Sequence, residues 1–377
     1  MVVFYRVANV PVHSCLALET REEAVGFPRG EMVLAFCEQC GFIANIAFDP
    51  GLGRYDDRYA DQQCHSARFR AFQSEQVQHL VSGYSVRRKR VAEIGCGAGD
   101  FLKELCRRGE NRGIGIDPRC PTDSSDDTPW IRFERTYFTE EYGKLSCDLV
   151  CCRHTLEHID ETGRLVRALR GSLHRADDAL VFIEVPNARR IIQEGAFWDI
   201  YYEHCSYFTT ESLKYLFQTN RFHVEELTSV YEDQYLTLFA RPVDMVDGQE
   251  TMLTRELAHV AAEAKEFADS AGRTMDHWRR RMTDLRQCRK RVAVWGAGSK
   301  CVSLLTSLDR CAFVDFVVDI NPAWHGKYLA GSGVKVTAPE DLPQLRPNVI
   351  LVMNPIYRGE ILHKLHELGV EAELVTT

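Results

Sequence analysis

Three glycines and two acids form the stretch of this sequence whose residue types and spacing indicate chemistry most directly. They are Glu93, Gly95, Gly97, Gly99 and Asp100. An apolar run precedes them and a helical pattern follows, which predicts a strand, a tight turn and the start of a helix. Glycines in such a turn allow positive φ and a close approach of the backbone to a ligand. The helix start adds unpaired backbone N–H groups.

A further acid, Asp117, ends the next apolar run, Gly113–Ile116. An acid at the end of the second strand can accept hydrogen bonds from both hydroxyls of a ribose. The carboxylates of Glu93 and Asp100 would repel the pyrophosphate of a dinucleotide, but they suit an amino group and a sulfonium. The turn therefore predicts a site for S-adenosylmethionine, and a structural turn in an unrelated α/β domain is the alternative.

A second stretch, from Phe197 to Phe208, combines aromatic side chains with Asp199, Glu203 and His204. It follows a late strand of the predicted sheet, and loops this rich in ionisable groups often carry function. Histidine has an ordinary pKa of ~6.5, so that its neutral form is available near pH 7. The loop therefore predicts a functional His204, and a buried histidine in an aromatic core loop is the alternative.

Two cysteines, Cys37 and Cys40, follow a strand-like run and precede a glycine, which is half of a zinc knuckle. A second pair with this spacing is missing from the sequence. Zinc bound by Cys37 and Cys40 is one interpretation, and a site that has lost its metal and is held by packing is the other. Four residues could supply further ligands: His13, Cys15, Cys64 and His65.

A third stretch repeats the strand, glycine turn and helix near the C-terminus, at Gly296, Gly298 and Lys300. Asp319 ends the strand that follows, and Cys301 stands where a dinucleotide turn would have its third glycine. Lys300 at the helix start could bind a phosphate. These residues disfavour a redox dinucleotide and predict a nucleotide-bearing substrate, with a purely structural domain as the alternative.

Strands and helices alternate from residue 86 to about 245, which predicts a doubly wound α/β sheet. Because ligands bind beyond the carboxyl ends of such strands, Asp117, His154–His158 and Glu184–Asn187 should rim one crevice. Apolar residues at helical spacing from Leu253 to Leu285 predict a long helix. The predicted parts are a small cysteine-bearing module at 1–70, the donor-binding core at 71–245, a connecting helix at 246–288 and a Rossmann-like domain at 289–377.

Composition limits the classes of function. The net charge of −8 argues against a nucleic-acid partner. The sequence has no apolar stretch long enough to span a membrane and no signal-peptide core. The 14 cysteines are scattered, several of them within apparent strands, as in proteins that keep their thiols reduced. We therefore expect a cytoplasmic protein that acts on a small molecule, as a monomer or a homodimer.

The stretch Glu93–Gly99 resembles the first motif of class I methyltransferases. Over nearly its whole length the chain resembles the three-domain sugar C-methyltransferases, which act on nucleotide-linked 4-keto-6-deoxy sugars. The run Tyr201–Phe208 is similar to that family's Y-H-E-H-x-S-Y-F, with Tyr202 in place of histidine. The C-terminal G-x-G-x-K and the segment Val318–Tyr328 match as well. The first CxxC of the family is missing, and Val10–Cys15 departs from the family's pattern.

The resemblance implies a class I methyltransferase that uses S-adenosylmethionine to methylate a carbon next to a ketone, through an enolate, in natural-product biosynthesis. It implies that His204 is the general base, supported by Tyr201 and Glu203. Further residues expected near the reacting groups are His158 and Tyr59. The expected donor site comprises Glu93, Gly95, Gly97, Gly99, Asp100, Asp117 and His154. The expected acceptor contacts are Lys300, Asn321 and Lys327.

Two other functions are compatible with the same sequence. An O- or N-methyltransferase acting on another small metabolite would have the same core. A nucleotide-binding protein without catalysis is the competing binding function, but the intact Glu93, Asp117 and His204 disfavour it. Exchange of an acceptor's α-proton for deuterium separates methylation of carbon from methylation of oxygen.

Overall fold

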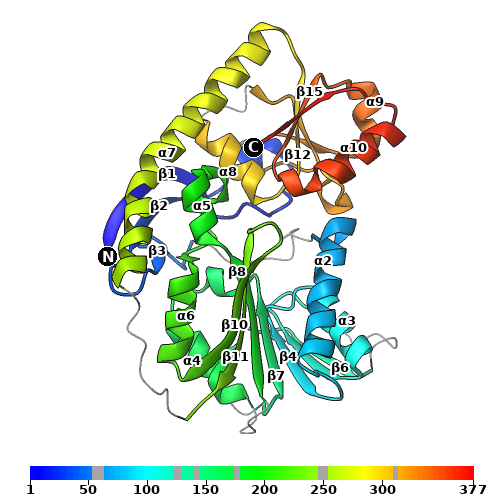
Figure 1. Ribbon diagram of the computed structural model, residues 1–377. Helices are drawn as coiled ribbons and strands as arrows, with labels where there is room; N and C mark the ends of the chain where they lie inside the picture. The colour runs from blue at the N-terminus through cyan, green and yellow to red at the C-terminus, as the bar shows by residue number, and fades with distance from the viewer. Residues whose placement is uncertain (53–62, 122–128, 140–144, 174–178, 245–253, 309–312) are drawn as a thin grey trace.

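The computed structural model describes residues 1–52, 63–121, 129–139, 145–173, 179–244, 254–308 and 313–377. Two α/β domains lie at opposite ends of the molecule, with the N-terminal strands between them (Figure 1). The long helix α7 (Thr254–Gln287) runs along one side. None of the described helices is long and apolar enough to cross a membrane.

The larger domain is built on a seven-stranded sheet in the order β10-β11-β8-β7-β4-β5-β6. The five strands β8, β7, β4, β5 and β6 pair in parallel, whereas β11 pairs antiparallel with β8 and β10. The strands are β4 (Arg90–Ile94), β5 (Arg112–Ile116), β6 (Ile131–Glu134), β7 (Leu149–Arg153), β8 (Leu180–Pro186), β10 (Phe222–Val230) and β11 (Tyr235–Pro242). This order confirms a doubly wound sheet, with its switch point between β4 and β7, where such folds bind ligands.

Helices flank this sheet and bury their apolar faces on it. In α3, for example, Phe101, Leu102 and Leu105 are buried in the same cluster as strand residue Val91. The helices of this domain are α2 (Ala67–Gln78), α3 (Asp100–Gly109), α4 (Thr162–Ser172), α5 (Ala188–Glu194) and α6 (Thr210–Thr219). The helix that follows the glycine turn is thus α3, as its apolar spacing predicts.

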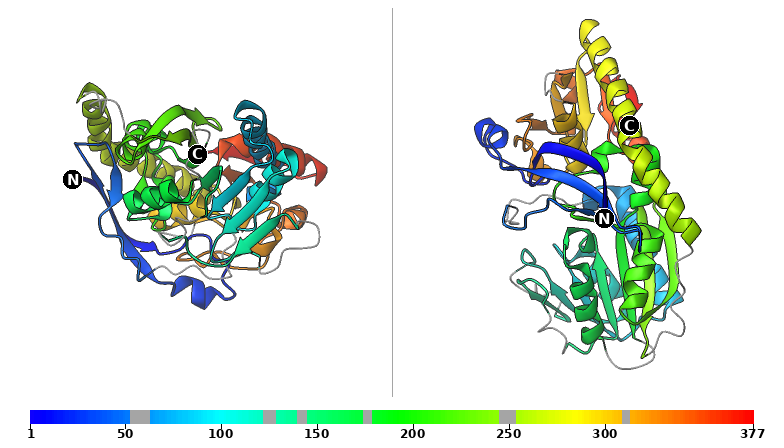
Figure 2. Two further views of the ribbon diagram at one scale, coloured as in Figure 1. Left: turned by 90° about the horizontal axis from the view of Figure 1, so that it is seen from below. Right: turned by 90° about the vertical axis from the view of Figure 1, so that its left-hand side faces the viewer.

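The N-terminal module is an antiparallel sheet that borrows a strand from the larger domain. Its order is β1-β2-β3-β9. The strands are β1 (Val2–Pro11), β2 (Arg29–Phe36), β3 (Ile43–Asn45) and β9 (Ser206–Tyr207), and a short helix, α1 (Arg21–Val25), precedes β2. Figure 2 shows this sheet, in its right-hand view, between the two α/β domains. Because β9 ends the aromatic stretch 197–208, that stretch is held by two parts of the chain at once.

The C-terminal domain contains a parallel sheet in the order β14-β13-β12-β15-β16. Its strands are β12 (Val292–Trp295), β13 (Phe316–Val318), β14 (Val336–Thr337), β15 (Val349–Val352) and β16 (Glu373–Thr376). Its helices are α8 (Ser299–Ser307), α9 (Leu342–Leu345) and α10 (Arg358–Glu367). The structure thus confirms a second strand, glycine turn and helix unit near the C-terminus.

One hydrophobic cluster joins these parts. Helix α7 contributes an apolar stripe that includes Val260, Phe267 and Trp278, as its helical spacing predicts. The ring of Phe267 packs edge-on against Tyr5 of β1, with ring centroids 4.9 Å apart. The same cluster includes Tyr202 of the aromatic stretch and buried residues of the C-terminal domain. The predicted domain boundaries therefore cut through this one cluster, while the two α/β sheets also have hydrophobic clusters of their own. The boundaries themselves stay a prediction.

Tyr202 packs between the N-terminal sheet and the larger domain. Its side chain is 1% exposed, and its hydroxyl accepts a hydrogen bond from the backbone N–H of Asp49 at 2.8 Å. Gly30 of β2 lies against the ring, and a Cβ there would overlap the ring of Tyr202. The tyrosine that departs from the family's histidine thus has a packing role that requires a glycine opposite.

We predict that Gly30→Ala lowers the stability of the protein by about 1–3 kcal/mol, because the added methyl group overpacks a closed interface. Gly272→Ala is the matched control, since an added Cβ there meets nothing within 4 Å in the middle of α7. Alanine at that position should be neutral or stabilising by up to ~1 kcal/mol. Urea unfolding of both variants measures the difference, and equal stabilities would contradict the packing role of Tyr202.

Candidate active site

A cavity of about 770 Å³ lies beyond the carboxyl ends of the core strands. It brings together the glycine turn, Asp117, the segment 154–158 and the aromatic stretch from Tyr201 to His204. These groups come from four different connections of the sheet, and the sequence predicts that they share one crevice. Within the predicted Glu184–Asn187 segment, Pro186 lines the cavity. Glu184 does not line it but pairs with Arg153, which does.

The glycine turn has the conformation that its residue types predict. Gly95 has a φ of +70°, and a Cβ at this position would overlap Thr155. Gly97 has a φ of +51° and faces open space, with nothing within 4 Å of an added Cβ. Its backbone N–H donates to Oδ2 of Asp117 at 3.1 Å. The turn thus leaves one face clear for a ligand and ties itself to the acid of the next strand.

Asp117 is held in a fixed orientation at the cavity. Its side chain is buried, and its Oδ1 accepts a hydrogen bond from the backbone N–H of Arg119 at 2.7 Å. With Gly97 on the other oxygen, the carboxylate is positioned by two backbone donors. A fixed carboxylate beyond the second strand is the arrangement that binds ribose hydroxyls. Asp100, by contrast, is exposed at the start of α3.

Glu93 is a buried acid at the floor of the cavity. Burial raises its pKa to about 8, although the nearby Arg153 lowers it in part. Its Oε2 has no hydrogen-bond partner among the described residues. The carboxyl group is therefore mostly protonated at pH 7 in the unliganded protein. A cationic group entering the cavity would stabilise the charged form, which fits a ligand with an ammonium group.

His154 stands at the end of β7 in a network of charges. Its φ is +47°, and its Nε2 lies 2.8 Å from Oε1 of Glu184. Burial alone would lower its pKa, but the nearby carboxylates of Glu157 and Glu184 raise it to about 9. Burial would raise the pKa of Glu184, whereas Arg153 and His154 bring it below its ordinary value. His154 is thus a charged residue of the donor cavity, backed by an ionised acid.

His204 sits at the wall of the same cavity, 5% exposed. Its ring centroid is 4.7 Å from that of His158 and 4.2 Å from that of Tyr201. Burial holds its pKa well below the ordinary value, and the charges of His158, His154 and Lys300 act in the same direction. His204 is therefore neutral at pH 7. The structure brings His204, His158 and Tyr201 together, as the resemblance implies.

The Glu203 side chain pairs with residues other than His204, so that the implied support of His204 by this carboxylate is wrong. The Glu203 carboxylate instead accepts hydrogen bonds from His13, at 3.0 Å from Nδ1, and from Ser14. Its backbone carbonyl accepts from Nδ1 of His158 at 3.0 Å. Tyr202 and Glu203 lie in a turn, which the hydrogen bond from the backbone N–H of His204 to the carbonyl of Tyr201 closes at 3.2 Å. Tyr59 lies outside the described residues.

Cys37 and Cys40 lie in the turn between β2 and β3, each partly exposed. Within the described ranges no third metal-binding side chain accompanies them. Of the candidate ligands, His13 hydrogen-bonds Glu203, and Cys15 contacts the C-terminal domain. Zinc at Cys37 and Cys40 therefore stays a prediction, without a ligand set that the described residues complete.

A different group of side chains could hold a cation. The donor atoms of Glu157, His158 and His204 lie within 4.8 Å of one another at the wall of the cavity. Two imidazoles and one carboxylate are ligands that divalent transition metals accept. Any activity assay of this protein therefore needs a chelator control.

A second cavity, of about 610 Å³, lies between the larger domain and the C-terminal domain. Tyr201 and Tyr235 line both cavities, so that the two spaces meet. On the C-terminal side the second cavity is lined by Asp319 and Asn321. Asp319 accepts from the backbone N–H groups of Ala297 at 2.6 Å and Asn321 at 2.7 Å. This pattern matches that of Asp117 in the first cavity.

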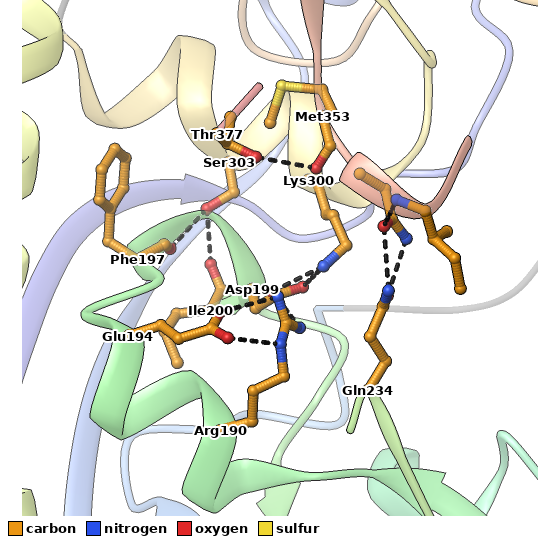
Figure 3. A network of polar contacts seen from close by, with 12 residues as sticks. Arg190, Glu194, Phe197, Asp199, Ile200, Gln234, Lys300, Ser303, Met353 and Thr377 are labelled. Carbon is orange, nitrogen blue, oxygen red and sulfur yellow. Dashed lines mark hydrogen bonds and ion pairs between the residues drawn. The ribbon is translucent and has the colours of Figure 1, made fainter. Parts of the chain in front are cut away.

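Lys300 is engaged in an internal ion pair. Its Nζ lies 2.6 Å from Oδ2 of Asp199, and Arg190 approaches the same carboxylate at 3.5 Å (Figure 3). Lys300 lines the second cavity, but the acid in the aromatic stretch already pairs with it, so that its contact with a phosphate stays a prediction. Lys327 pairs with Glu19 at the surface and lines neither cavity.

Similarities to known proteins agree with this geometry. A methyltransferase domain family matches residues 66–227, and the C-methyltransferase C-terminal domain family matches residues 244–375. The chain is 27% identical over 290 residues to the C-methyltransferase NovU of Streptomyces niveus, which covers 72% of this chain and 68% of that protein.

Solved structures with a similar core include two methyltransferases. A S-adenosylmethionine-dependent methyltransferase from Aquifex aeolicus aligns with a TM-score of 0.38 and 11% identity, over 50% of this chain and 100% of that chain. The 1,6-didemethyltoxoflavin-N1-methyltransferase of Burkholderia thailandensis aligns with a TM-score of 0.37 and 17% identity, over 46% of this chain and 79% of that chain.

The strand order of the core, its glycine turn and the acid at Asp117 define a class I S-adenosylmethionine-dependent methyltransferase. The two family matches, one to each part of the chain, narrow the class of enzyme from methyltransferases in general to C-methyltransferases. The protein belongs to the S-adenosylmethionine-dependent C-methyltransferases, and S-adenosylmethionine is its methyl donor.

Sequence reasoning missed several residues of the site. It considered His13 only as a metal ligand, although His13 lines the first cavity and pairs with Glu203. It did not foresee the pair of hydrogen bonds between Gln234 and Asn354, which join the two α/β domains at 2.9 and 2.7 Å. No local spacing links such residues, because each pair joins segments far apart in the chain.

The high pKa of Glu93 leads to a calorimetric prediction. Binding of S-adenosylmethionine at pH 7 should release close to one proton, because the ligand's ammonium group favours the carboxylate over the carboxyl form that burial imposes. Titration in two buffers of different ionisation enthalpy measures this release. Glu93→Gln should bind without proton release, whereas Glu110→Gln, a surface control, should behave as the wild type. Equal proton release in all three proteins would contradict this role of Glu93.

The ion pair of Lys300 leads to a second prediction. Asp199→Ala should destabilise the protein by about 3–5 kcal/mol, because two cations then remain without their buried acid. Lys327→Met removes an exposed pair and should change stability by only ~0–1 kcal/mol. Chemical unfolding of both variants tests the contrast. A small effect of Asp199→Ala would mean that the Lys300 charge is free for a substrate phosphate.

Proposed function

We propose that this enzyme methylates a carbon next to a ketone in a nucleotide-linked sugar or a related metabolite. The observation that carries the proposal is the junction of the two cavities at Tyr201 and Tyr235. An acceptor with two chemically different ends fits this junction. Its nucleotide end would occupy the cavity of the C-terminal domain, and its reactive end would reach the donor cavity.

The donor end is arranged for a sulfonium ligand. Asp117 would hold the ribose hydroxyls, and Glu93 would face the ammonium group, while Gly97 leaves the backbone surface open. S-Adenosylmethionine supplies an electrophilic methyl group when bound. The His154 side chain lies in the same cavity and is itself the cation that pairs with Glu184. We assign it to positioning the residues around the methyl donor.

The nucleotide end would be recognised mainly through its ribose. Asp319 is fixed by two backbone donors in the same way as Asp117, and Asn321 follows it at the cavity wall. An acid held in this manner suits a pair of hydroxyls. Because Lys300 is paired with Asp199, the phosphates would contact the backbone N–H groups at the N-terminus of α8, which Gly298 precedes as the N-cap.

His204 would remove the proton from the acceptor. Its burial keeps it neutral, so that the lone pair of the imidazole is available at pH 7. As the C–H bond breaks, the proton moves to His204 and the electron pair spreads onto the ketone oxygen. Tyr201, next to His204, would hydrogen-bond that oxygen or fix the ring. The enolate carbon then takes the methyl group, and the ketone forms again.

The setting of the enzyme follows from its thiols and its surface. All the cysteines that the structure describes are free, and most are buried. We place the enzyme in the cytoplasm for this reason, where such thiols stay reduced. The same setting fits a role in natural-product biosynthesis. Whether it acts as a monomer or a homodimer stays open to measurement by light scattering.

The test of this function uses proton exchange rather than product formation alone. A nucleotide-linked 4-keto-6-deoxy sugar is incubated in deuterium oxide with S-adenosylhomocysteine, so that enolate formation is seen without methyl transfer. The wild type should incorporate deuterium at one carbon next to the ketone. His204→Asn should lose exchange and kcat by a factor on the order of 10²–10⁴ while keeping its affinity for S-adenosylhomocysteine.

The matched control is His223→Asn, because His223 is exposed on β10 and lines neither cavity. It should leave exchange unchanged. Assays with and without a chelator separate base catalysis from a cation at Glu157, His158 and His204. A His204→Asn protein that is stable and fully active would rule out His204 as the base. Methylation of oxygen without any α-proton exchange would refute the proposed reaction.

A further inference from the structure

A buried pair of ionisable side chains lies on the wall of the donor cavity that the N-terminal module forms. His13 is 3% exposed, and its Nδ1 lies 3.0 Å from Oε1 of Glu203. Both residues line the cavity that also holds His204. The proposed reaction, as described above, uses neither of them. His13 belongs to the segment Val12–Cys15, which crosses from β1 to the interface between the two α/β domains.

We propose that His13 is a further catalytic residue, which donates a hydrogen bond from Nε2 to the ketone oxygen of the acceptor and stabilises the enolate. This inference rests on the proposed methylation next to a ketone. Glu203 would then be a positioning residue, which fixes the His13 ring through Nδ1. A hydrogen-bond donor aimed at a developing oxyanion is among the strongest contributions that an active site makes.

The geometry sets the orientation of the His13 ring. Because Nδ1 points to Glu203, Nε2 is the ring's other polar atom and lies at the opposite edge of the imidazole. The carboxylate is itself held from a second side, since Ser14 donates to its Oε2. Burial would raise the pKa of Glu203, but His13 and Ser14 bring it below the ordinary value, so that Glu203 stays ionised at pH 7.

His13 and His204, which line the same cavity, have different surroundings. His204 is packed against His158 and Tyr201, and burial holds its pKa well below the ordinary value, although a carboxylate oxygen of Glu157 lies within 4.8 Å. Its environment disfavours a positive charge, which suits a base. His13 has the carboxylate of Glu203 at hydrogen-bond distance from Nδ1, which fixes the ring and suits a donor at Nε2. Pairs of titratable groups whose environments differ in this way divide the acid and base roles in other enzymes.

A structural role alone would not require this pair. Apolar residues anchor the N-terminal module to the core elsewhere, as Tyr202 and Tyr5 do. A buried ion pair is seldom more stabilising than apolar packing of the same volume. The pair stands at the edge of a cavity, where its charges would act on a ligand.

The proposed step balances in atoms and electrons. The α-proton of the acceptor moves to His204, and the electron pair of the broken C–H bond moves onto the ketone oxygen. His13 keeps its proton and shares it with that oxygen through a hydrogen bond. When the carbon takes the methyl group of S-adenosylmethionine, the electron pair returns from the oxygen, the C=O bond forms again and S-adenosylhomocysteine leaves.

The experiment measures deuterium exchange at the α-carbon of a nucleotide-linked 4-keto-6-deoxy sugar in the presence of S-adenosylhomocysteine. We expect His13→Gln to lose exchange by a factor on the order of 10²–10³, the loss typical of one oxyanion donor. Its affinity for S-adenosylhomocysteine, measured by calorimetry, should stay within about twofold of the wild type. His79→Gln is the matched control, because His79 forms an exposed pair with Glu226 at 3.2 Å, away from both cavities.

Glu203→Gln is the second variant and keeps an acceptor for the Nδ1–H of His13 while removing the charge. It should fold, bind S-adenosylhomocysteine and lose part of the exchange, whereas a merely structural pair predicts normal exchange in the folded protein. Exchange at the wild-type rate in His13→Gln or in Glu203→Gln overturns the inference and leaves the proposed function intact. A wild type that exchanges no α-proton refutes the proposed function and this inference with it.

Discussion

The buried ion pair between Lys300 and Asp199 is the interaction on which the arrangement of the domains depends. Asp199 belongs to the aromatic stretch, and Lys300 opens the first helix of the C-terminal domain. A carboxylate withdrawn from water must keep its partner, so that the two segments cannot separate without exposing or orphaning a charge. Ser303 reinforces the contact by donating to the carbonyls of Phe197 and Ile200, at 3.2 and 2.7 Å (Figure 3). The two cavities meet because this corner is fixed.

Local spacing predicted the parts of the site that are built within one strand, turn and helix. The glycine turn and Asp117 are of this kind, because the geometry of the unit dictates where the next strand's acid falls. Lys300 and Glu203 show where such reasoning ends. Their partners lie 101 and 190 residues away in sequence, and only the packing of domains brings them together. A side chain's local position indicates what it could bind, but its nearest buried opposite charge decides what it does bind.

The segment Val12–Cys15 contacts the walls of both cavities. Ser14 donates to Glu203 in the donor cavity and lies 2.8 Å from Ser299, at the start of the helix that lines the second cavity. The sequence departs from its family in this segment, and the structure shows that the altered residues contact both halves of the site. The N-terminal module thus forms part of the wall of the donor cavity through Val12 and His13.

The strand β9, which pairs with β3, has a consequence for how the protein is made. The N-terminal sheet stays incomplete until residue 207 has been synthesised. The β-bridge between Leu18 and Tyr328 can form only after Tyr328 has been synthesised. At ~5–20 residues per second, the first strands leave the ribosome tens of seconds before their last neighbours exist. Contacts of such long range slow folding. The edge of β3 that β9 later covers is therefore unpaired for that interval, so that the N-terminal sheet is completed only late in synthesis.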